Sequence, residues 1–198
     1  MSKRIGFVSL KGGVGKTSLA VHLAFYLHEA GEEVALVDGD PIESCHRWSA
    51  TGAGFPFSVL YPGDRWPAGW LVFDTEAHPE QADLRALGDT LDLVVIPTTP
   101  NMDAIDAALM TAPALRTGKV KVRAIVNRAP PAHLPDGENT RAALEENGLE
   151  TCGAILHAYK AYEFARLAGT SVKDAGHAGS MRAWEEFQTF AEEVLHGL

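Results

Sequence analysis

Short runs of branched apolar residues alternate with longer helical patterns along almost the whole chain, and this alternation restricts the possible folds more than any other feature. Such an order is typical of a parallel sheet whose strands are joined by crossover helices. We therefore expect an α/β fold: a doubly wound, mostly parallel sheet with helices on both faces. The expected strands cover residues 5–10, 34–38, 57–60, 71–74, 91–97, 120–127 and 153–156. The expected helices cover residues 17–30, 42–50, 79–90, 102–116, 137–147, 159–168 and 181–195.

The composition is that of an ordinary globular protein, with 46% hydrophobic and 22% charged residues. The two cysteines lack a CxxC partner, which argues against an iron–sulfur cluster, a zinc knuckle or a redox pair. This cysteine usage favours a reducing cytoplasm as the location. No run of roughly 18 apolar residues is present, so we expect no transmembrane segment. Residues 1–198 are expected to form a single domain, without an N-terminal DNA-reading domain, since no helix-turn-helix segment precedes the first strand.

The charge balance limits nucleic-acid binding to a local patch. The net charge is −9, with 17 Lys+Arg against 26 Asp+Glu, which disfavours polyanion binding by the whole surface. Two segments are locally basic: the first holds Arg116, Lys119, Lys121, Arg123 and Arg128, and the second holds Lys160, Arg166, Lys173 and Arg182. Either set is compatible with non-specific DNA binding through phosphate contacts, and solvated surface charge is the competing interpretation.

A glycine-rich loop follows the first strand and opens directly into the first helix, a context typical of phosphate binding. Backbone N–H groups of such a loop point at phosphate oxygens, Lys16 reaches the β/γ-phosphates, and the Thr17 hydroxyl binds Mg²⁺. The residues expected to bind nucleotide here are Lys11, Gly12, Gly13, Val14, Gly15, Lys16, Thr17 and Ser18. Leu10 stands where the standard pattern has glycine, so this phosphate loop is a variant.

Carboxylates follow two of the expected strands. Phosphoryl transfer needs a metal ion near the phosphates and a group that positions the attacking water. Asp38 and Asp40 end the second strand on the same side of an extended chain, although an acidic turn with a helix cap would explain them as well. Asp74 ends an apolar strand in the form of a Walker B segment, whose carboxylate holds Mg²⁺, usually through water.

Four blocks of the sequence resemble motifs of the ParA/MinD superfamily of ATPases, which are P-loop NTPases, and the likeness is closest to short ParA-type partition ATPases. The phosphate loop with its early Lys11 resembles the family's deviant Walker A motif, K-G-G-x-G-K-[ST]. The segments at 38–41, 97–100 and 127–128 resemble its D-x-D-P motif, its Pro-x-x-Pro turn and its Asn-Arg pair. Because these blocks occur in the family's order, we take the resemblance to cover nearly the whole chain.

The resemblance implies roles for individual residues. Lys11 would reach the partner's nucleotide across a dimer interface, Lys16 would contact the phosphates, and Asp40 would orient the hydrolytic water; these three form the expected catalytic set. Asn127 would read the adenine edge by donating and accepting together, although a turn residue capping a strand is the alternative. The expected metal set is Thr17, Asp38 and Asp74.

The same resemblance implies a homodimer with ATP sandwiched at its interface, non-specific DNA binding, and slow hydrolysis of ATP to ADP and phosphate. A ParB-like or cargo adaptor protein would stimulate the hydrolysis, and the protein would be nucleoid-associated. The cargo, whether a plasmid, a chromosome origin or a protein assembly, is left open. One alternative is a MinD-like membrane-surface ATPase, which the acidic C-terminal segment disfavours. A metabolic ATP-dependent enzyme on the same fold is the other.

A few positions depart from the family pattern or remain open. Ile42 stands where the family commonly has glutamine. Glu76 is either a further water-positioning base or, as we favour, a surface carboxylate at a helix start. The spacing of Trp184, Phe187 and Phe190 predicts a helix face in the core.

Overall fold

The computed structural model describes residues 2–116, 119–196 and 198, and its strands form one parallel sheet. Over these residues the sheet has seven strands, in the order β3-β2-β4-β1-β5-β6-β7. The strands are β1 (Lys3–Ser9), β2 (Val34–Gly39), β3 (Ser58–Leu60), β4 (Trp70–Ala77), β5 (Leu93–Thr98), β6 (Lys121–Ala129) and β7 (Thr151–His157). The helices are α1 (Lys16–Glu29), α2 (Ser44–Ser49), α3 (Gln81–Thr90), α4 (Met102–Leu115), α5 (Asp136–Glu146), α6 (Ala161–Ala168) and α7 (Ser180–His196). The predicted α/β fold is confirmed.

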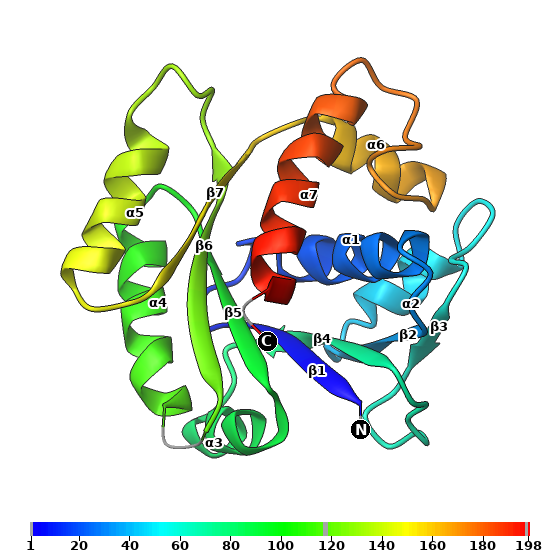
Figure 1. Cartoon of the computed structure of the whole chain (residues 1–198), viewed down its shortest axis with the longest axis horizontal. Helices are drawn as coiled ribbons and strands as arrows, with labels where there is room; N and C mark the ends of the chain where they lie inside the picture. The colour runs from blue at the N-terminus through cyan, green and yellow to red at the C-terminus, as the bar shows by residue number, and fades with distance from the viewer. Residues whose placement is uncertain (1, 117–118, 197) are drawn as a thin grey trace.

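Helices cover both faces of the sheet: α1, α2, α6 and α7 lie on one side, and α3, α4 and α5 lie on the other (Figure 1). The strands supply both cores, because successive side chains point to opposite faces. Leu93 and Val95 of β5 join the buried cluster that contains α1 and α7, whereas Val94 and Ile96 join the cluster that contains α4. Burial on both faces explains why these strands read as continuous apolar runs.

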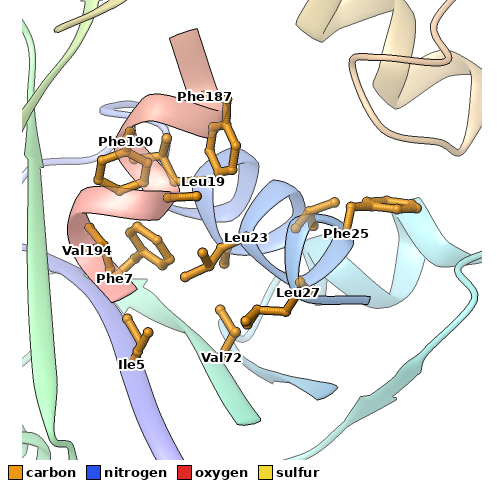
Figure 2. Close-up of a cluster of buried hydrophobic side chains, with 14 of the residues drawn as sticks. Ile5, Phe7, Leu19, Leu23, Phe25, Leu27, Val72, Phe187, Phe190 and Val194 are labelled. Atoms are coloured by element: carbon orange, nitrogen blue, oxygen red, sulfur yellow. The ribbon is translucent and has the colours of Figure 1, made fainter. Parts of the chain in front are cut away.

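Helix α1 is more deeply buried than its sequence pattern predicts. The spacing of Leu19, Leu23 and Leu27 predicts a single apolar stripe, but Ala20 and Val21 are also fully buried. The reason is tertiary: α7 packs on the same face of the sheet beside α1, and its Phe187, Phe190 and Val194 lie in the same buried cluster as the α1 side chains (Figure 2). The predicted core face of the last helix is confirmed, because Trp184, Phe187 and Phe190 are buried.

The order of the strands creates a crevice at the carboxyl end of β1. The chain passes from β1 through α1 to β2 on one side, and from β4 through α3 to β5 on the other. In open parallel sheets, ligands bind where the winding direction reverses in this way, outside the carboxyl ends of the strands. Because all the strands are parallel, β2, β4, β5 and β6 also end at this edge.

Helix α2 is shorter than expected: it begins at Ser44 and not at Ile42. The two preceding residues belong to a turn, because Asp40 Oδ1 accepts a hydrogen bond of 2.8 Å from Ile42 N, and Glu43 adopts a left-handed conformation with φ 54°. Asp40 is therefore held just beyond the end of β2, before α2 begins.

Glutamates of α7 cover the open edge of the sheet. Glu193 accepts hydrogen bonds from the backbone N–H groups of Gly153 and Ala154 in β7, and Glu186 accepts from the backbone N–H of His157. An edge strand otherwise presents unpaired backbone groups on which another chain can add a strand. Part of the acidity of the C-terminal helix therefore has a structural use. Within the described ranges, no helix combines the length and the hydropathy that a membrane span requires.

Candidate functional site

The phosphate loop, residues 10–17, leaves β1 at the central crevice and turns into α1. Gly13 and Gly15 adopt φ values of 77° and 96°, which side chains with a Cβ rarely accept, and Gly15 is the N-cap of α1. Because no side chain caps this end of the helix, the first backbone N–H groups of α1 lack a side-chain acceptor. The loop therefore presents backbone donors and the positive end of a helix dipole, the arrangement that binds phosphate.

Two residues at the end of β6 donate hydrogen bonds to carbonyl oxygens of the phosphate loop. Asn127 is buried, and its Nδ2 donates a hydrogen bond of 2.8 Å to the carbonyl oxygen of Val14. The neighbouring Arg128, in a left-handed conformation with φ 55°, donates from Nη1 to the carbonyl oxygen of Gly13 at 2.8 Å. These contacts place the predicted Asn-Arg pair against the loop. One N–H of the Asn127 amide is thereby used, while the contact with adenine stays a prediction.

A cavity of about 310 Å³ adjoins these contacts on the side of α6. Its lining includes Gly15 and Ser18, Asn127 at the end of β6, and Tyr159 and Lys160 of the turn between β7 and α6. It is the space next to the phosphate loop in which a base could lie beside Asn127. The β7–α6 turn, which supplies Tyr159, was not singled out in the sequence because it carries no glycine or motif residue.

Lys16 is the charged group at the centre of the site. Its side chain is buried, and burial lowers the pKa of its ammonium group, while the charges of Asp74, Asp40 and Glu76 act in the opposite direction. The carboxylates come from the ends of β2 and β4, and the lysine comes from the first turn of α1. The tertiary structure thus brings the phosphate-loop lysine near carboxylates from two strand ends.

Glu76 differs from its predicted position. We expected a surface carboxylate at a helix start, but β4 continues to Ala77 and α3 begins only at Gln81. Glu76 is therefore a half-buried strand residue whose charge acts on Lys16. The apolar run of this segment ends before Asp74, so the sequence carries no local signal that β4 continues through Glu76.

Asp74 is almost fully buried at the register position opposite Asp38 on the adjacent strand. Burial raises the pKa of its carboxyl group to about 6, an effect opposed by the nearby Thr17 hydroxyl and by a hydrogen bond from Cys45 Sγ, 3.3 Å from Oδ2. Its other oxygen, Oδ1, is buried without a hydrogen-bond partner among the described residues. A buried carboxylate oxygen without a partner, beside the Thr17 hydroxyl, fits a divalent cation held partly through water.

Asp38 is engaged by backbone groups of α2 and the turn before it. Its Oδ2 accepts hydrogen bonds from Cys45 N (2.9 Å) and His46 N (3.0 Å), and its Oδ1 accepts from Asp40 N (3.3 Å). Asp38 thus accepts hydrogen bonds from the first turn of α2, although the N-cap residue of this helix is Glu43. Its contribution to a magnesium network stays a prediction, and by these contacts it would act through the groups that it holds.

Lys11 and Asp40 lie at the open mouth of the site. Lys11 Nζ lies 3.3 Å from Asp103 Oδ2, and its side chain is 40% exposed. It lines a cleft of about 490 Å³ together with Asn101, Arg128 and the exposed loop glycines. Asp40 is half-buried and makes the turn to Ile42 described above. Both residues are partly exposed.

The two predicted basic segments are divided by the fold. Lys121 begins β6 and Arg128 lies near the other end of the same strand, beside the phosphate loop, while Arg123 between them lies 2.7 Å from Glu150. In the second segment Lys173 lies 2.9 Å from Glu29, and Arg182 lies 4.0 Å from Glu186. Lys160 and Arg166 are exposed at the two ends of α6, and Lys160 also lines the cavity of about 310 Å³. Exposed positive charge on the nucleotide side therefore comes from Lys160 of the second segment and from Arg128 of the first.

Comparison with known proteins agrees with this geometry. The profile of the CobQ/CobB/MinD/ParA nucleotide-binding domain matches residues 5–163. The chain is 32% identical over 197 residues to "Maintenance of carboxysome distribution protein A" of Gloeobacter kilaueensis, covering 93% of this chain and 90% of that protein.

Solved structures show the same fold. A plasmid partition protein of Borrelia burgdorferi bound to AMPPNP superposes with a TM-score of 0.78 at 16% identity, covering 100% of both chains. The septum site-determining protein MinD of Pyrococcus horikoshii with Mg-ADP gives a TM-score of 0.77 at 18% identity, covering 100% of this chain and 98% of the other. At these identities the likeness concerns the fold.

Proposed function

Because the chain belongs to the CobQ/CobB/MinD/ParA nucleotide-binding family, we propose that it is a ParA-like ATPase that binds Mg·ATP, dimerises around it and positions a cargo. The observation that carries the proposal is the burial of Lys16 among three carboxylates at the start of a helix whose backbone donors face the same point. A buried ammonium group and free backbone N–H groups are suited to a triphosphate.

Each part of the nucleotide has a counterpart in the chain. The triphosphate would lie on the phosphate loop, with Lys16 at the β/γ-phosphates, and the base would enter the cavity beside Asn127 and Tyr159. Thr17 and the unpartnered Oδ1 of Asp74 would hold Mg²⁺, which neutralises charge on the phosphates when bound. We propose that residues 1–198 act as one ATPase domain.

Hydrolysis requires a water molecule aligned with the terminal phosphate. Asp40 is the candidate, because its carboxylate lies at the rim, acts on Lys16, and is held by the turn to Ile42. With its Oδ1 engaged by Ile42, its Oδ2 is left for the water. Glu76 is a second carboxylate close enough to influence Lys16, and it contributes to the negative field that attracts a divalent cation.

Dimerisation would complete the site through Lys11. Its ammonium group is held by one exposed aspartate at 3.3 Å, a surface pair of the kind that contributes little to stability, so moving it toward a partner's phosphates costs little. The cleft of about 490 Å³ next to Lys11 is open to a second subunit. The ADP-bound or empty protein would then be monomeric.

The cargo proposal follows the relative named for carboxysome distribution, which the chain matches over most of its length. We propose a protein assembly or a DNA molecule as the cargo, an adaptor that stimulates hydrolysis, and a nucleoid-associated location in the cytoplasm. The MinD-like membrane alternative is disfavoured because the apolar face of α7 is occupied by the core, with Trp184, Phe187 and Phe190 buried. A free amphipathic helix is needed to lie on a membrane.

The test of the proposed function is light scattering of the purified protein with Mg²⁺ and ATP, ADP or no nucleotide. We expect the molar mass to double with Mg·ATP alone and to return to the monomer value as ATP is consumed. A monomer under all conditions would contradict the dimer, and ATP that is neither bound nor hydrolysed would contradict the ATPase itself. Turnover that depends on an added small substrate would favour the metabolic alternative.

A further inference from the structure

A buried thiol contacts the Walker B carboxylate, and no motif explains it. Cys45 is fully buried in the first turn of α2, and its Sγ lies 3.3 Å from Asp74 Oδ2. In this contact the Cys45 thiol is the hydrogen-bond donor and Asp74 Oδ2 is the acceptor. Cys45, Asp38 and Asp74 have ligand atoms within 4.8 Å of one another.

Asp38 determines where this thiol lies. The register places Asp38 directly opposite Asp74, so two buried carboxylates face each other across β2 and β4. The charge of Asp38 is compensated by backbone N–H donors, two of which belong to Cys45 and His46. The hydrogen bond of 2.9 Å from Cys45 N to Asp38 Oδ2 anchors the residue whose side chain then reaches Asp74.

The two oxygens of Asp74 therefore have different surroundings. Oδ2 is held by the thiol, whereas Oδ1 is buried without a partner among the residues that the structure describes. A carboxylate with one oxygen fixed has its plane fixed, so its other oxygen keeps a constant direction. This asymmetry would be lost if Oδ2 had no donor, because either oxygen could then rotate toward a cation or toward Lys16.

We propose that Cys45 is a positioning residue for magnesium-dependent nucleotide binding: it holds Oδ2 of Asp74 so that Oδ1 faces the cation. This inference rests on the proposed function and assigns a role to a residue outside the expected metal set. Two hydrogen bonds, from Cys45 N to Asp38 and from Cys45 Sγ to Asp74, connect the end of β2 to β4 through the first turn of α2. A movement of α2 would change the orientation of the carboxylate.

The test compares the affinity for a fluorescent ATP analogue with Mg²⁺ and with EDTA, by fluorescence titration. In Cys45→Ala, the gain in affinity from Mg²⁺ should shrink about tenfold, the lower end of the loss seen when a residue that orients a metal ligand is removed. The affinity in EDTA should stay at the wild-type value. Cys45→Ser, which restores a donor, should recover most of the gain.

Cys152→Ala is the matched control, because Cys152 is also a fully buried free cysteine but lies in β7. It should leave both affinities unchanged. A Cys45→Ala protein that keeps the full magnesium gain would overturn the inference, and so would one that loses affinity equally in EDTA, because the thiol would then support only the fold. If Mg²⁺ does not raise the affinity of the wild-type protein for the ATP analogue, the proposed function itself is contradicted. That result differs from a failure of the Cys45 proposal alone, in which the wild-type protein still responds to Mg²⁺.

The hydrogen bond of the Cys45 thiol can also be observed directly, by infrared spectroscopy of the wild-type protein. The S–H stretching band of Cys45, identified by its absence in Cys45→Ser, should absorb at lower frequency than that of a thiol without an acceptor. Addition of Mg²⁺ and the ATP analogue should leave that band in place, because the thiol holds the oxygen that does not face the cation. Disappearance of the hydrogen-bonded band on magnesium binding would contradict the proposed arrangement.

Discussion

Gly15 in the phosphate loop and Asn127 at the end of β6 fill one small space: a Cβ on Gly15 would collide with Nδ2 of Asn127. The same Nδ2 donates to the carbonyl oxygen of Val14, so the loop and the strand end fix each other. This contact joins residues that are more than a hundred positions apart in the chain. It explains why this position requires glycine for two separate reasons, its φ of 96° and the missing space.

The first prediction concerns this contact. Gly15→Ala should lower ATP affinity at least about tenfold, because a left-handed alanine costs about 1–2 kcal/mol and the methyl group also displaces Asn127. The matched control is Gly31→Ala: Gly31 has φ 81° but open space around it, so it carries the strain without the collision. Isothermal titration with ATP should show wild-type affinity for the control, and equal losses in both variants would contradict the role of the contact.

The second prediction separates the two lysines of the loop. Lys16→Ala should abolish ATP binding, with a loss of at least about a hundredfold, since a charge-assisted contact of about 3 kcal/mol is removed. Lys11→Ala should bind ATP with near wild-type affinity but stay monomeric in light scattering, because its ammonium group is at the exposed rim. Tight ATP binding by Lys16→Ala would remove the phosphate-loop assignment.

The third prediction tests Asp40 as a catalytic group rather than a turn residue. Asp40→Asn retains an oxygen that can accept from Ile42 N, so the turn should persist while the charge is lost. We expect ATP binding and an accumulated dimer, with hydrolysis slowed about a hundredfold, the lower end of the range for general acid–base groups. Phosphate release assays measure the rate, and wild-type turnover in this variant would exclude Asp40 from the reaction.

The fourth prediction concerns DNA. Affinity for random duplex should require Mg·ATP and fall steeply with salt, because each neutralised phosphate releases counterions. Replacing Lys160 and Arg166 by alanine should weaken binding and flatten the salt slope. Replacing Lys119 and Lys121 by alanine removes the same amount of charge at the start of β6, at the other end of that strand from the phosphate loop. This variant should bind DNA nearly as well as the wild-type protein. Because Lys160 also borders the nucleotide cavity, ATP affinity is measured in parallel. If the variant at Lys119 and Lys121 loses more DNA affinity than the variant at Lys160 and Arg166, the DNA-binding patch lies at the start of β6 and not on α6.

The fifth prediction concerns pH. Burial lowers the pKa of His22 to about 4; as the neutral tautomer it donates from Nδ1 to the Ser18 carbonyl oxygen at 2.6 Å and accepts from Val172 N at 2.9 Å. The unfolded chain binds a proton near pH 6.5 and the folded one does not, so stability should fall as the pH drops from about 6.5 toward 4.

The lowered pKa of His22 corresponds to a loss of about 3 kcal/mol in the free energy of unfolding once the pH is below about 4. Asp74 acts oppositely: its raised pKa stabilises the fold at low pH, and this contribution is lost as the pH rises through about 6. Urea unfolding of His22→Gln between pH 7 and pH 5 isolates the histidine contribution, because Asp74 is common to both proteins. If the unfolding free energy of His22→Gln falls between pH 7 and pH 5 as much as that of the wild-type protein, the pH dependence does not come from His22.

The helices, the strands and the phosphate loop could be predicted from the sequence, because their signals are local. Glycines at 13 and 15, the lysine at 16 and the apolar runs of the strands act through backbone conformation and through burial on two faces. Those requirements are visible within a window of a few residues. The order of motifs along the chain was enough to indicate the family, which the profile match then confirmed.

The tertiary structure decided which polar groups meet. Asp38 faces Asp74 only because β2 and β4 are neighbours in register, and the side chain of Cys45 reaches Asp74 only because Asp38 anchors its backbone. Glu76 acts on Lys16 because β4 extends farther than its apolar residues indicate. The expected basic patches were divided because ion pairing depends on neighbours from distant segments, as for Arg123 with Glu150. Contacts of this kind depend on strand register and helix packing, which the local sequence does not encode.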